Sequence, residues 1–121
     1  MNKPFISCFM SVVLVLGCSV TSWGHGVLIE SSPSQGAILK ESPTLITLRF
    51  NAALEPSISQ VSLVDLKHQK TTLNITDEST VERIVATVPP LPPGVYYVHY
   101  QVLATDGHVT EGSIRFTILT H

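Results

Sequence analysis

Apolar residues occupy every second position over several short stretches of the chain, and turn residues separate these stretches. The pattern is clearest over 45–50, where Ile46, Leu48 and Phe50 would share one face, and over 96–102, the longest stretch. A period of two residues is typical of strands with one buried face. Shorter stretches of the same kind cover 27–30, 61–63, 73–75, 84–88 and 114–118. We therefore expect strands throughout, and no helix longer than a turn.

The spacing of these stretches predicts how the strands pack. About seven strands follow one another at intervals of about 8 to 12 residues, as in two-sheet sandwiches. Strands with one apolar face each can bury those faces when two antiparallel sheets pack together. Gly94-Val95-Tyr96 also looks like a tyrosine corner, whose hydroxyl would tie the strand start to nearby backbone. The sequence thus predicts an all-β antiparallel sandwich.

The first 24 residues follow a different pattern. Lys3 gives a positive start, an almost wholly apolar run covers 5–16, and small residues lead up to Ser22 and Gly24. This order is that of a secretory signal peptide. The apolar run is too short for a membrane-spanning helix, which needs about 20 residues. We therefore predict a cleaved signal over 1–24 and one mature domain over 25–121.

A second processing route starts from Cys18. Residues 15–18 loosely resemble a lipobox, in which the cysteine is lipidated and becomes the new terminus. That route would leave the amine of His25 inside a peptide bond. Cleavage before His25 is preferred because Leu16 is bulky for a lipobox. It would remove both cysteines and both methionines, leaving no disulfide, no thiolate and no soft Cu(I) site.

Length and charge exclude several classes of protein. A chain of 121 residues holds one domain. Its formal net charge of -2, without a run of lysines or arginines, lacks the basic patch that nucleic-acid binding requires. No catalytic triad, phosphate loop or carboxylate pair is recognisable, so nothing supports hydrolytic catalysis.

Among the histidines, His25 is a candidate metal ligand. After cleavage His25 would be the first residue, offering a metal both its α-amine and its ring Nδ1 in one chelate ring. An α-amine has a reference pKa of about 7.7 to 8, whereas the side-chain amine of lysine has a pKa of about 10.4. A metal therefore displaces the proton of an α-amine more readily than the proton of a lysine side chain. We expect His68, His99 and His121 to be solvated surface residues, since they lie in a polar turn, on a polar strand face and at the chain end.

Asp106-Gly107-His108 offers further donors in a predicted turn. A carboxylate and an imidazole separated by one glycine can face the same point. The first strand and the end of the penultimate strand can lie at one edge of a sandwich, which would bring His25 to them. The four groups supply three nitrogens and one oxygen, a set that favours tetragonal Cu(II) over tetrahedral zinc.

Several short motifs occur in order along the mature chain. They are His25, Ser31-Ser32-Pro33 with Gly36, Leu48-Arg49-Phe50, Gly94-Val95-Tyr96, Asp106-Gly107-His108 and residues 112–116. With these motifs the chain resembles the CopC-like periplasmic copper-resistance proteins. The resemblance implies an immunoglobulin-like Greek-key β-sandwich that binds one Cu(II) per chain through His25, Asp106 and His108. It also implies a periplasmic, monomeric copper carrier or buffer, beside a CopD-like inner-membrane copper permease.

The resemblance is incomplete at one position near the metal. Many family members carry a glutamate two residues after the phenylalanine, close to the copper, where this chain has Ala52. Glu55 need not replace it. Because groups around the ligands change metal affinity by about 10- to 100-fold, the resemblance does not fix the copper affinity.

Two other functions start from the same residues. Lytic polysaccharide monooxygenases also begin with a histidine that chelates copper on a sandwich fold. The mature chain is short for their broad substrate surface, and Asp106 would fill a position that an oxygen-activating site keeps open, so we predict no enzyme. The other alternative is a metal-free interaction sandwich, in which Asp106 and His108 serve only the turn, since Asp-Gly is a common turn dipeptide.

Overall fold

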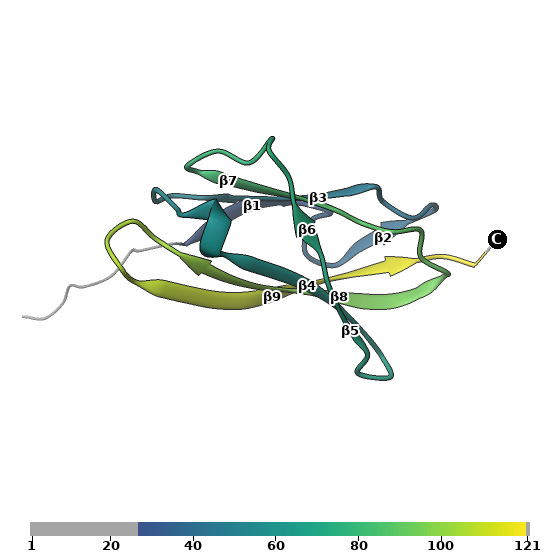
Figure 1. The fold of residues 1–121 in the computed structure, drawn as a ribbon. Coiled ribbons are helices and arrows are strands. Elements are labelled where there is room, and N and C mark those ends of the chain that lie inside the picture. The colour runs from purple at the N-terminus through teal and green to yellow at the C-terminus, as the bar shows by residue number, and fades with distance from the viewer. Residues whose placement is uncertain (1–26, 121) are drawn as a thin grey trace, which may run out of the picture.

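The computed structural model describes residues 27–120, which form strands and a single turn of 3-10 helix (Figure 1). In chain order the elements are β1 (Leu28–Ser32), β2 (Ala37–Leu39), β3 (Leu45–Phe50), η2 (Pro56–Ile58), β4 (Gln60–Asp65), β5 (Lys70–Thr72), β6 (Asn74–Ile75), β7 (Arg83–Thr87), β8 (Gly94–Leu103) and β9 (Val109–Ile118). No helix within this range is long and apolar enough to cross a membrane. The predicted signal over 1–24 lies outside the described residues.

The strands form two sheets that pack face to face (Figure 1). One sheet has the order β1-β3-β7-β6, and the other has the order β2-β9-β8-β4-β5. The predicted all-β sandwich is therefore confirmed. Within the described range β2 pairs with β9 in parallel, while the other paired strands are antiparallel.

Two details differ from the predicted strands. The stretch over 73–75 is not one strand, because the chain leaves β5 in one sheet and enters β6 in the other at Leu73. Leu73 is buried, and its N–H donates to the carbonyl of Val61 at 2.8 Å. Its apolar side chain fills the core from a crossover, which alternation alone cannot distinguish from a strand. The short β2 was not predicted, because its three residues are all apolar and show no alternation. In the structure Ile38 at its centre is exposed.

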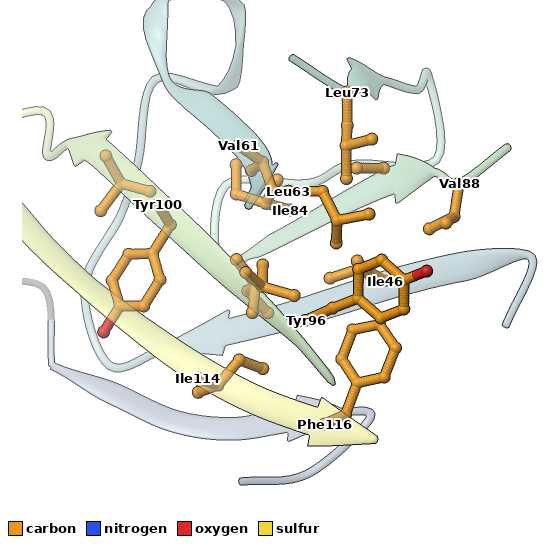
Figure 2. Packing of buried hydrophobic residues seen from close by; sticks show 14 of the residues in the cluster. Ile46, Val61, Leu63, Leu73, Ile84, Val88, Tyr96, Tyr100, Ile114 and Phe116 are labelled. Atoms are coloured by element: carbon orange, nitrogen blue, oxygen red, sulfur yellow. The ribbon is translucent and has the colours of Figure 1, made fainter. Parts of the chain in front are cut away.

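The core lies between the inner faces of the two sheets (Figure 2). Ile46, Leu48 and Phe50 of β3 are at most 1% exposed, as their shared face predicted. The ring of Phe50 meets that of Tyr100 edge to face, with centroids 5.4 Å apart, and the rings of Tyr96 and Phe116 stack at 5.6 Å. Residues 27–120 contain no cysteine, so burial of these side chains is the main source of stability in this part of the chain.

Tyr96 forms the predicted tyrosine corner. Its hydroxyl donates to the carbonyl oxygen of Pro92 at 2.6 Å, four residues before it. Burial, with a smaller effect from the Asp65 carboxylate, raises the pKa of Tyr96 above its ordinary value. The hydroxyl therefore stays protonated and acts as a donor at neutral pH.

Replacing Tyr96 by Phe is expected to lower the free energy of unfolding by about 1 kcal/mol, the usual net value of one hydrogen bond. Denaturant titration of both proteins measures this difference. Tyr97→Phe is the matched control, because Tyr97 lies on the opposite face of β8 and is 37% exposed. Equal losses in the two variants would contradict a stabilising role for the corner.

Candidate metal centre

The turn between β8 and β9 presents Asp106 and His108 at one end of the sandwich. β8 and β9 pair over their whole lengths, from Gly94 opposite Ile118 to Leu103 opposite Val109. The N–H of Gly107 then donates to the carbonyl of Ala104 at 2.9 Å. Gly107 has a φ of +94°, a conformation that favours glycine. The glycine thus lets the chain reverse between two residues that carry donor atoms.

The two predicted ligands of this turn lie against each other. Oδ1 of Asp106 accepts a hydrogen bond from the backbone N–H of His108 at 3.0 Å, and Nδ1 of the His108 ring is 3.1 Å from the same oxygen. Their side chains are 43% and 61% exposed, respectively. The backbone bond is also the ordinary contact of an aspartate in a turn. The arrangement therefore serves the turn and, at the same time, presents a carboxylate and an imidazole together to solvent.

The third residue of the predicted ligand set is not among residues 27–120. Among residues 27–120, no group of three or more histidine, cysteine, aspartate or glutamate side chains is placed to hold a metal ion. His25, the third predicted ligand, lies outside the described residues. The predicted centre thus depends on what the segment before Val27 brings to the turn.

The start of β1 lies at the same end of the sandwich as this turn (Figure 1). Val27, the first described residue, exchanges two hydrogen bonds with Asn51, just after β3. The carbonyl of Ala53 in turn accepts from the N–H of Thr105 at 2.9 Å. Hydrogen bonds therefore connect the beginning of the described chain, through 51–53, to the residue before Asp106.

The other described histidines lie outside the turn, as predicted. His68 is exposed in the connection between β4 and β5, with a φ of +64°. His99 lies in the middle of β8, opposite Ser113, and its Nε2 is 3.7 Å from Oε2 of Glu111. Ala52 follows Asn51 and brings no side-chain donor atom to this end. His121 lies outside the described residues.

The comparisons with known proteins agree with this fold. The profile of the CopC domain family matches residues 28–119. Copper resistance protein C of Xanthomonas campestris pv. juglandis is 28% identical over 124 residues, which cover 94% of this chain and 97% of that protein. Copper transport protein CutJ of Bacillus subtilis is 26% identical over 101 residues, which cover 81% of this chain but only 19% of CutJ.

A solved structure gives the same result. The crystal structure of CopC from Methylosinus trichosporium OB3b superposes with a TM-score of 0.73 and 31% sequence identity, covering 80% of this chain and 96% of that one. The family profile spans every strand from β1 to β9. The chain described here therefore belongs to the CopC domain family.

Proposed function

We propose that this protein binds one Cu(II) ion in the periplasm and carries or buffers it in copper homeostasis and resistance. The ligands in this proposal are the α-amine and ring of His25, the carboxylate of Asp106 and the ring of His108. The observation that carries the proposal is the exposed Asp106–His108 pair, at the end of the sandwich where the described chain begins.

The chemistry of the donors supports Cu(II) rather than Cu(I). Residues 25–121 contain neither cysteine nor methionine, so protein sulfur, which Cu(I) prefers, is absent from the proposed mature chain. Nitrogen donors with one carboxylate suit tetragonal Cu(II), which is also the most tightly held divalent ion of its series. Binding requires the amine to lose its proton, so the affinity falls as the pH is lowered.

The comparisons support a role in transport or storage rather than catalysis. The relatives are named for copper resistance and copper transport. In CutJ the matched part is only 19% of the protein, so a segment of this kind is joined there to a much larger copper transport chain. We propose that the present protein acts as a monomer that exchanges copper with a separate membrane protein, a CopD-like permease, and that it is not an enzyme.

Titration of the exported, processed protein with Cu(II) tests this function. We expect one ion per chain, with release of a proton. His108→Ala should weaken binding by more than about 10- to 100-fold, the range for groups that only support a ligand. His99→Ala is the matched control, because His99 lies in the middle of β8 on its outer face.

Two results would contradict the proposal. One is a processed protein beginning at His25 that takes up no copper. The other is an equal affinity in the wild type, His99→Ala and His108→Ala, which would leave Asp106 and His108 with a role in the turn alone.

A further inference from the structure

Asn51 extends the pairing of β1 with β3 beyond the ends of both strands. After a register shift between Leu28 and Glu30, Leu28 lies opposite Phe50, the last residue of β3. One pair further out, Oδ1 of Asn51 accepts from the N–H of Val27 at 2.9 Å, and the N–H of Asn51 donates to the carbonyl of Val27 at 3.1 Å. The side-chain oxygen thus takes the acceptor role that a strand carbonyl has in a ladder.

We propose that Asn51 is a positioning residue for copper binding, which fixes Val27 so that the free amino terminus two residues earlier meets Asp106 and His108. This inference rests on the proposed function. Two residues of chain span at most about 7 Å. The place at which Val27 is held therefore limits the positions that the amine and ring of His25 can take.

The segment that follows Asn51 is itself held against the β8–β9 turn. The carbonyl of Ala53 accepts from Thr105 at 2.9 Å, Leu54 forms a β-bridge with Ala104, and the N–H of Glu55 donates to the carbonyl of Leu103 at 2.8 Å. Leu54 is 1% exposed, so this segment is anchored in the core as well. Asn51 thus connects the amino-terminal segment to a support that also holds the turn before Asp106.

The contact with Asn51 is expected to hold Val27 in place before copper binds. Val27 and Asn51 are both on the surface, and Val27 is 46% exposed, so hydrophobic burial does little to hold the first described residue in place. Without the Asn51 oxygen, the N–H of Val27 would bond to water, and the end of β1 would be free to separate. Copper binding would then have to order this segment at the moment of binding, which lowers affinity.

The experiment compares three variants of the exported, processed protein. Asn51→Ala should weaken Cu(II) binding about tenfold in a chelator competition titration. The electron paramagnetic resonance spectrum of bound Cu(II) should stay that of the wild type, because no ligand is removed. Asn51→Asp keeps an oxygen acceptor for Val27 and should bind at least as tightly as the wild type. Asn74→Ala, on the exposed part of β6, is the matched control.

Hydrogen exchange of the Val27 amide in the copper-free protein gives a measurement that is independent of metal. We expect exchange to be slowed in the wild type and in Asn51→Asp, and about five- to tenfold faster in Asn51→Ala. Wild-type affinity in Asn51→Ala, or a changed spectrum, would overturn the positioning role. A wild type that binds no copper would refute the proposed function, while the exchange data would still show whether Asn51 holds Val27.

Discussion

A single glycine added in front of His25 is expected to weaken Cu(II) binding by more than about 100-fold. The addition converts the α-amine of His25 into an amide, which is a poor ligand unless it loses its proton. The other three proposed donors, the two imidazole rings and the Asp106 carboxylate, are unchanged, because every side chain remains in place. A loss larger than that caused by removing a supporting group, about 10- to 100-fold, distinguishes a ligand from a neighbour of the metal.

The same glycine placed after His121 is the matched control for this variant. It adds the same residue at the opposite end of the chain, since β9 runs away from the turn that holds Asp106. Affinity and the spectrum of bound Cu(II) should be those of the wild type. Mass spectrometry of each purified protein establishes where it begins. Tight binding by the amino-terminally extended protein, with an unchanged spectrum, would show that the amine of His25 is not a ligand.

The lipobox alternative leads to a different observation. A protein that begins at an acylated Cys18 would carry His25 inside the chain, and its copper affinity should already resemble that of the extended variant. The mass of the wild-type protein therefore decides how the titrations are interpreted. Only a chain that begins at His25 tests the proposed ligand set.

The alternation of apolar residues predicted most of the fold because each strand has one buried face. β3 begins and ends at the predicted residues, and β8 buries Tyr96, Val98, Tyr100 and Val102 as expected. The crossover at Leu73 was predicted to be part of a strand, and the error has a physical reason. A crossover residue and a strand residue can bury the same side chain, and only the pairing partners, which lie far away in sequence, distinguish them.

The candidate site was predictable in part. Asp106 and His108 were proposed because both flank a turn glycine, and their side chains lie 3.1 Å apart in the structure, while their role as ligands stays a prediction. The role of Asn51 could not be recognised. An asparagine after a strand is an ordinary turn residue, and its bond to Val27 joins residues 24 positions apart. Such a contact follows from the β1–β3 register, which periodicity does not determine.

Replacing Phe50 by Ala is expected to lower the free energy of unfolding by about 3–5 kcal/mol, the usual cost of removing a fully buried aromatic ring. Phe50 is 1% exposed and packs edge to face against Tyr100 of the other sheet. A domain of this size has a total stability of about 5–15 kcal/mol. No cysteine in 27–120 provides a disulfide that could compensate for the lost packing. Denaturant titration of the copper-free protein measures the loss.

Leu45→Ala is the matched control, because Leu45 starts the same strand and is 39% exposed. It should cost clearly less than Phe50→Ala, and equal losses would show that the Phe50 ring is not a main source of stability. Repeating the denaturant titration with Cu(II) distinguishes a loss of folding stability from a loss of copper binding. At about 100 times its Kd, a ligand that binds only the folded state adds about 2.7 kcal/mol, so Cu(II) should stabilise Leu45→Ala as much as the wild type. Phe50 directly precedes Asn51, so a smaller gain in Phe50→Ala would mean that the core beneath β3 also supports the copper site.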